Sequence, residues 1–103
     1  MIDVRYDGKY CVLLEGHAGQ APCGQDIVCA GASTLLCTLA AYFEKHSNEL
    51  ERYEINMSSG KGVVDVIPTE AFEGSCATAF EFALTGLSSI AELYPSYIRF
   101  TPL

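Results

Sequence analysis

Residues 10–45, YCVLLEGHAGQAPCGQDIVCAGASTLLCTLAAYFEK, contain in succession a strand, a loop and a helix. Residues 10–14 are an unbroken apolar run, which predicts a strand buried on both faces near the centre of a sheet. Small residues, glycine and proline make residues 18–25 a predicted loop. Asp26 is a favourable helix N-cap, and the apolar residues that follow it at helical spacing predict a helix over about residues 27–46.

Further strands are predicted on both sides of this stretch. Residues 2–7 alternate between apolar and charged side chains, which is typical of a strand with one wet face, and a hairpin would pair them with residues 10–14. Residues 53–57 and 63–67 also have strand character, and residues 58–62 form a flexible turn between them. The sequence therefore predicts two hairpins.

A second helix follows the second hairpin. Apolar side chains in residues 72–94 recur with a period of 3.6, so we expect a long helix that Pro68 and Thr69 open and Pro95 ends. Gly74 and Gly86 inside this helix each cost about 1 kcal/mol, and close packing is the reason that we expect for them.

The order of these elements decides the fold class. Residues 97–101 add a last short edge strand, which gives the order ββαββα(β). This order predicts an α+β fold in which two helices pack on a mostly antiparallel sheet. The chain is short enough for one compact domain, residues 1–103.

The charge balance is acidic, with 6 Lys plus Arg against 13 Asp plus Glu. Nucleic-acid binding needs clustered cations that neutralise phosphates, so we expect no nucleic-acid partner and favour a basic protein partner. The chain has no unbroken run of about 18 apolar residues. Asp3 and Asp7 lie where a secretory signal carries positive charge. We expect no membrane partner and a cytoplasmic location.

The five cysteines are an odd number without the spacing of a disulfide framework: Cys11, Cys23, Cys29, Cys37 and Cys76. The cytosol would keep them reduced. We expect most of them to be small core residues, with Cys11, Cys37 and Cys76 on apolar strand or helix faces.

Cys29 and His17 form a candidate catalytic pair. If Asp26 is the cap, Cys29 occupies the third helical position, where unpaired backbone N–H groups and the helix dipole stabilise a thiolate. His17 ends the central strand, and the loop after it would fold it over the helix start as the general base. The same helix N–H groups could hold the oxyanion that forms in acyl transfer.

Two further residues of this region have alternative roles. Asp26 is either a helix cap alone or a cap whose carboxylate also orients His17 or holds the loop. Ser33 comes four residues after Cys29 and lies on the same helix face. It is either a small packing residue bonded to its own helix or a polar group near the thiol.

Other interpretations compete with the catalytic one. A Cys/His pair this far apart is weak evidence by itself, and a structural cysteine is the default. A metal site of His17, Cys23 and Cys29 matches no paired-cysteine zinc pattern and has no obvious fourth ligand, so we expect neither a metal nor a cofactor. His46 is interpreted as a helix-end residue near the last carbonyl groups. Four further residues could line a peptide groove, but residues at strand and helix spacing are more often plain core: Tyr53, Met57, Phe72 and Phe80.

Residues 16–33 closely resemble the signature of the ribosomal-processing cysteine proteases, the Prp family. Glycine, histidine, aspartate, cysteine and serine all fall at the family's spacing, in Gly16, His17, Ala18, Asp26, Val28, Cys29, Ala30 and Ser33. The resemblance covers nearly the whole chain, because the order of strands and helices is similar too.

The resemblance implies a cysteine endopeptidase that removes a short N-terminal extension from a large-subunit ribosomal protein before ribosome assembly. That protein is the one numbered twenty-seven in common usage, and it is basic, which suits an acidic enzyme. The family likeness gives the catalytic roles to His17 and Cys29 and implies a homodimer. It also implies a mobile substrate loop made of Ala18, Gly19, Gln20, Ala21, Pro22, Cys23, Gly24 and Gln25.

Cys23 departs from the family motif and could cross-link to Cys29. A non-catalytic ribosome-associated binding module with the same fold is the alternative function.

Overall fold

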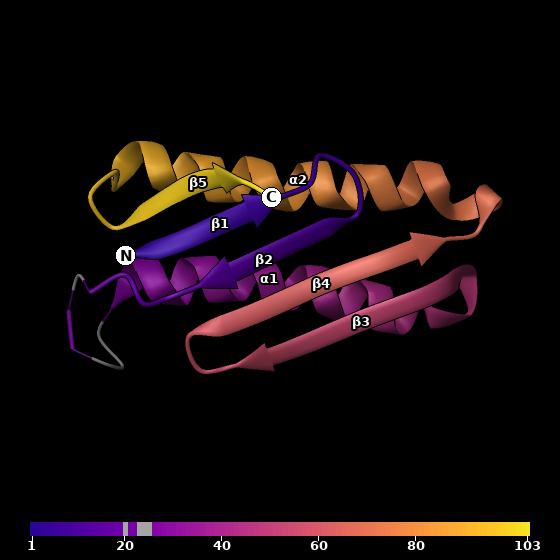
Figure 1. The fold of residues 1–103 in the computed structure, drawn as a ribbon, viewed down its shortest axis with the longest axis horizontal. Helices are drawn as coiled ribbons and strands as arrows, with labels where there is room; N and C mark the ends of the chain where they lie inside the picture. The colour runs from indigo at the N-terminus through magenta and orange to yellow at the C-terminus, as the bar shows by residue number, and fades with distance from the viewer. Residues whose placement is uncertain (20, 23–25) are drawn as a thin grey trace.

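The structure is a computed structural model that describes residues 1–19, 21–22 and 26–103. Five strands and two long helices build it (Figure 1). Their bounds, with those of two short 3-10 turns, are β1 Ile2–Tyr6, β2 Cys11–Glu15, α1 Ile27–Lys45, the turn Ser47–Glu49, β3 Leu50–Ser58, β4 Lys61–Pro68, the turn Glu70–Phe72, α2 Glu73–Leu93 and β5 Ile98–Pro102. The predicted order of elements and the α+β fold class are confirmed.

The strands form one mixed sheet in the order β3-β4-β2-β1-β5. Three of the strand pairs are antiparallel, namely β1 with β2, β2 with β4, and β3 with β4. The fourth pair is parallel, because β5 runs in the same direction as β1. β2 therefore has a neighbour on each side, as its apolar sequence predicted. The predicted burial on both faces is wrong, because Val12 and Leu14 are buried whereas Cys11 and Leu13 are only half-buried. Both helices cover the same face of the sheet (Figure 1), with α1 against β3 and β4 and α2 against β5.

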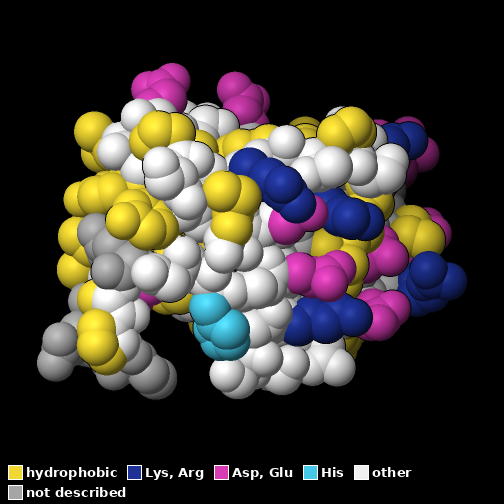
Figure 2. All heavy atoms as spheres, turned by 60° about the vertical axis from the view of Figure 1, so that its left-hand side comes forward, with side chains coloured by type: hydrophobic (Ala, Val, Ile, Leu, Met, Phe, Trp, Pro, Cys, Tyr) yellow, Lys and Arg dark blue, Asp and Glu magenta, His cyan; other side chains and the backbone are white. Residues whose placement is uncertain are grey.

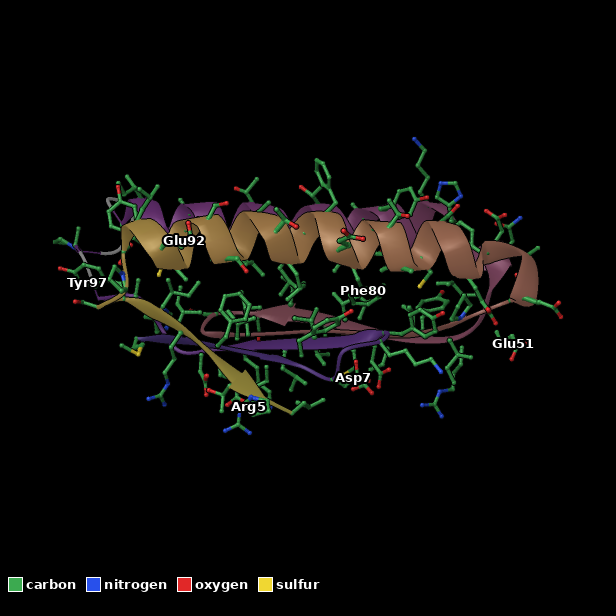
Figure 3. The ribbon with its side chains drawn as sticks, turned by 90° about the horizontal axis from the view of Figure 1, so that it is seen from above. Arg5, Asp7, Glu51, Phe80, Glu92 and Tyr97 are labelled. Carbon is green, nitrogen blue, oxygen red and sulfur yellow. The ribbon has the colours of Figure 1, made fainter. Side chains whose placement is uncertain are left out.

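The core lies between the helix layer and the sheet. Figure 3 shows these two layers from the side, with Phe80 of α2 pointing toward the strands. The Phe80 ring stacks on the Tyr6 ring of β1, with 5.9 Å between the centroids. Alternate strand residues and one stripe of each helix supply the most deeply buried side chains, among them Val4, Val12, Val64, Leu36, Phe43, Cys76 and Leu87.

The start of α2 differs from its prediction. β4 continues through Pro68, and the turn Glu70–Phe72 precedes the helix. Gly86 is closely packed as expected, because a methyl group there would lie 2.9 Å from Leu35 Cδ1. The same explanation is wrong for Gly74, where a methyl group would meet nothing within 4 Å.

By its length and composition alone, α1 could cross a membrane, because its mean hydropathy is 1.5. The core helix of a soluble protein meets the same test. α1 packs against the sheet and α2 through its buried residues Val28, Ala32, Leu36, Leu39, Ala40 and Phe43. Its apolar composition therefore has an explanation inside this fold.

Charge is distributed unevenly between the two layers. α1 has no charged residue before Glu44. The face of the sheet away from the helices carries both signs of charge, on Asp3, Arg5, Arg52, Asp65 and Arg99. Figure 2 shows this contrast, with intermingled basic and acidic side chains over one half of the view and hydrophobic side chains gathered over the other.

Candidate active site

Cys29 lies in the first turn of α1, as its third residue. The carboxylate oxygen Oδ1 of Asp26 accepts a hydrogen bond from the Cys29 backbone N–H at 2.9 Å. Asp26 has an extended backbone and only 8% of its surface is exposed. The predicted N-cap is confirmed, and it positions Cys29 by its own backbone.

The sulfur of Cys29 has a backbone donor of its own. The N–H of Ala18 donates a hydrogen bond to Cys29 Sγ at 3.1 Å. Ala18 is buried, with 4% of its surface exposed. An N–H group aimed at sulfur stabilises negative charge on it, as does the nearby helix N-terminus.

His17 follows the end of β2 by way of Gly16. Gly16 has a φ of 97°, a left-handed conformation that glycine adopts without strain. A methyl group at Gly16 would also clash with the carbonyl oxygen of Met1. Gly16 thus turns the chain out of the sheet at a point where no side chain fits. The turn places His17 near the start of α1.

His17, Cys29 and Ser33 line two cavities. The smaller, of about 200 Å³, extends to the β3–β4 turn, and the larger, of about 570 Å³, extends to Asp26 and the loop. Among the described residues, no hydrogen bond joins the His17 ring to the Cys29 thiol. Such bonds are often long before substrate binds, so the shared cavities are the informative feature.

Ser33 is exposed and borders both cavities, so it is not an interior packing residue. Of the predicted substrate loop, Gly19 and Ala21 line the larger cavity. Ala18 and Pro22 are described but do not line it, and Gln20, Cys23, Gly24 and Gln25 lie outside the described residues.

The β3–β4 turn is a part of the site that the sequence analysis missed. Residues 58–62 line the smaller cavity together with Met57, which is 38% exposed and not plain core. The only local signal was the pair of glycines at positions 60 and 62. A methyl group at Gly62 would clash with the Leu36 side chain, so the second glycine keeps the turn close to α1.

A family model described as cysteine protease Prp matches residues 1–99. This chain belongs to the Prp family of cysteine proteases. The ribosomal processing cysteine protease Prp of Mycoplasma genitalium is 31% identical over 98 residues, which are 95% of this chain and 92% of that protein. The protein of the same name from Staphylococcus aureus is 32% identical over 100 residues, with the same two coverages of 95% and 92%.

Solved Prp structures have the same fold. The S. aureus enzyme in complex with a covalently linked product peptide has a TM-score of 0.82 at 30% identity, with 100% of both chains covered. A second S. aureus Prp structure, in complex with a substrate peptide, has a TM-score of 0.73 at 26% identity and covers 99% of this chain and 97% of that one.

A Prp protease needs a reactive thiol, and two of the cysteines are poor candidates. Burial raises the pKa of Cys11 to about 11, and nearby Asp65 adds to the effect. Burial alone raises the pKa of Cys76 to about 11. Cys37 is exposed, so the expectation that most cysteines are small core residues is wrong for it. Cys23 lies outside the described residues.

The metal alternative and His46 are the other candidates from the sequence. Within residues 1–19, 21–22 and 26–103, no three His, Cys, Asp or Glu side chains are grouped so that they could hold a metal ion. Cys23, a member of the metal alternative, is not described. His46 ends α1, where its Nδ1 lies 2.8 Å from Glu49 and its ring packs on Tyr42 and Phe72.

Proposed function

We propose that Cys29 is the nucleophile and His17 the general base of a cysteine endopeptidase that trims a ribosomal protein. The observation that carries this proposal is that both side chains line the same two cavities, at the capped start of a helix. A helix N-terminus and a nearby imidazole are the surroundings that activate a thiol.

The chemistry follows from this arrangement. His17 accepts the thiol proton as Cys29 Sγ attacks the peptide carbonyl carbon, and it then donates that proton to the leaving amine. The acyl group stays on sulfur as a thioester. Water, deprotonated by His17, hydrolyses the thioester, which releases the new carboxylate and restores the thiol.

Two of the helix N–H groups that the sequence suggested for the oxyanion already have acceptors. The Cys29 N–H is already bonded to Asp26 Oδ1, and the Ala30 N–H to the Asp26 carbonyl. The Ala18 N–H, which contacts Sγ at 3.1 Å, is the donor that we assign to the oxyanion. When sulfur bonds to the carbonyl carbon, the oxygen of that carbonyl comes within reach of a donor beside sulfur.

We infer that the substrate is the N-terminal extension of a basic large-subunit ribosomal protein, the one numbered twenty-seven. Two curated relatives carry the name ribosomal processing cysteine protease, and solved S. aureus Prp holds substrate and product peptides. The net charge of −7 favours encounter with a basic protein. Nucleic acid and membrane are not partners in this proposal, and a reducing cytoplasm would keep Cys29 a free thiol.

The test is cleavage of purified ribosomal proteins, with new N-termini mapped by mass spectrometry. Wild type should shorten the ribosomal protein at one site, and Cys29→Ala and His17→Ala should each abolish cleavage while they leave the melting temperature near that of wild type. Cys37→Ala removes an exposed thiol from the same helix and is the matched control. Residual cleavage by Cys29→Ala would exclude the thiol mechanism, and binding without cleavage by wild type would favour the non-catalytic module.

We also propose that the chain is a homodimer that pairs through its helix layer. The outer side of α1 is uncharged up to Glu44, and Phe82 of α2 is 79% exposed beside an apolar groove of about 660 Å³. Two copies with a net charge of −7 repel least where charge is absent. Light scattering should give a dimer mass for wild type and for the control Phe100→Glu, and a monomer mass for Phe82→Glu. A monomeric wild type would exclude the dimer.

A further inference from the structure

The His17 ring packs against the backbone of Gly60 in the β3–β4 turn. A methyl group added at Gly60 would lie 2.8 Å from His17 Nε2 and 3.4 Å from Cε1. A side chain at position 60 would therefore push the ring away, because carbon and nitrogen atoms that are not bonded do not approach so closely. The His17 ring therefore occupies the space that a side chain at position 60 would fill.

The same turn is tied to the residue before His17. The Gly16 N–H donates a hydrogen bond to the Gly60 carbonyl oxygen at 2.8 Å. This bond extends the β2–β4 ladder beyond the pair Glu15 and Lys61. This one hydrogen bond thus joins the backbone of Gly16, which precedes His17, to the backbone of Gly60, which lies against the His17 ring.

The turn also forms a wall of the reactive cavity. Ser58, Ser59 and Lys61 line the cavity of about 200 Å³ together with His17 and Cys29. His17 thus stands between this wall and the start of α1. A shift of the ring away from Gly60 would change its distance and angle to the Cys29 sulfur.

We propose that Gly60 is a positioning residue for His17, and that the β3–β4 turn sets the orientation of the imidazole toward Cys29. The inference rests on the proposed role of His17 as the general base. Gly60 itself touches no reacting atom in this scheme. Its effect on cleavage acts through the imidazole.

The chain offers a matched control for this proposal. Gly60 has a φ of 75° and Gly8, in the β1–β2 turn, has a φ of 81°. Alanine at either position has the same backbone strain. A methyl group at Gly8 meets nothing within 4 Å, whereas one at Gly60 meets His17. The difference between Gly60→Ala and Gly8→Ala therefore isolates the contact with the ring.

The first measurement follows the ring itself by proton NMR. The chain has 2 histidines, so two imidazole Hε1 signals are expected, and the variant His17→Ala assigns them. Gly60→Ala should shift the His17 signal and leave the His46 signal in place, and Gly8→Ala should shift neither. An unshifted His17 signal in Gly60→Ala would overturn the proposal. If Gly60→Ala does not fold, Gly60→Asn introduces the same Cβ with less strain, because asparagine tolerates positive φ.

The second measurement is the cleavage rate on the ribosomal protein. Displacement of a catalytic group by about 1 Å can cost about 100-fold, so we expect Gly60→Ala to lower kcat at least about ten-fold and Gly8→Ala to change it less than about two-fold. The pH profile of Cys29 alkylation should move in Gly60→Ala toward that of His17→Ala. If the cleavage rate of Gly60→Ala equals that of Gly8→Ala, the inference about Gly60 is overturned, while the proposed function is unaffected. If His17→Ala cleaves like wild type, the proposed function fails instead.

Discussion

At the scale of single residues, the thiols differ in what surrounds each sulfur. Cys29 Sγ accepts the Ala18 N–H at a helix start, whereas burial raises the pKa of Cys11 and of Cys76 to about 11. Iodoacetamide near pH 7 should therefore label Cys29 well before Cys11 and Cys76, because only thiolates react. Labelling of those two should rise as the pH approaches about 11.

Cys37 is the exposed reference for this experiment. Thiolates are the reactive form, so at about pH 7 Cys29, whose sulfur has a backbone donor at a helix start, should be labelled faster than Cys37. Mass spectrometry after peptide digestion reads all sites at once. Equal labelling rates at both sites would show that Cys29 is not activated before substrate binds.

Asp26 caps α1, and its carboxylate is also a candidate for orienting His17 or holding the loop. Asp26→Ala removes the oxygen that accepts the Cys29 N–H, so it should lower the free energy of unfolding by about 1 kcal/mol. Asparagine is an equally good cap, and Asp26→Asn should keep that stability. Urea denaturation and cleavage rates of both variants separate the roles. A stable Asp26→Asn that cleaves slowly would show that the charge does more than cap α1, by orienting His17 or by holding the loop. Wild-type stability in Asp26→Ala would contradict the cap.

At the scale of elements, the two α2 glycines should respond differently to alanine. Gly74 has open space beside it, so Gly74→Ala should raise the free energy of unfolding by up to about 1 kcal/mol through helix propensity. Gly86→Ala makes the same gain but must displace Leu35, whose methyl carbons would lie 2.9 Å away. Urea midpoints should rank Gly74→Ala above Gly86→Ala. The reverse order would mean that Leu35 moves without cost.

Local sequence patterns predicted most elements, because each strand or helix shows its own period. The capping residue Asp26 predicted the start of α1 to the residue. In each hairpin, alternation indicated the first strand and a run of apolar residues indicated the second. The start of α2 was missed because its periodicity does not reveal that β4 continues through Pro68. The contact between Gly60 and His17 was missed because it joins residues 43 positions apart. Only the pairing of β2 with β4 brings those positions together.

At the scale of the whole molecule, the first and last strands are joined by side chains as well as by backbone. Thr101 of β5 donates a hydrogen bond to the Asp3 carboxylate of β1, and this bond, with smaller help from Arg5 and Arg99, lowers the Asp3 pKa. A carboxyl with a lowered folded pKa contributes stability above its unfolded pKa, and that stability is lost as the pH falls through the folded value.

This linkage predicts that the free energy of unfolding of Asp3 and Thr101 variants falls less steeply with decreasing pH than that of wild type. Asp3→Asn should be less stable than wild type at about pH 7, and the difference should shrink below about pH 4. Thr101→Val, which keeps the carboxylate but removes its donor, should show a smaller loss with the same trend. Urea midpoints across this range provide the measurement. A stability difference independent of pH would show that the Asp3 charge plays no part.

The β3–β4 hairpin that borders the site lies at the margin of the sheet. β3 is an outermost strand, paired only with β4 among the described strands, and most of its side chains are exposed. Edge elements of this kind open locally at a smaller free-energy cost than global unfolding. Heat should therefore inactivate the enzyme reversibly at temperatures where the Phe80 core is still folded. Cleavage rates compared with near-ultraviolet circular dichroism over a temperature ramp would reveal that gap, and coincident curves would exclude it.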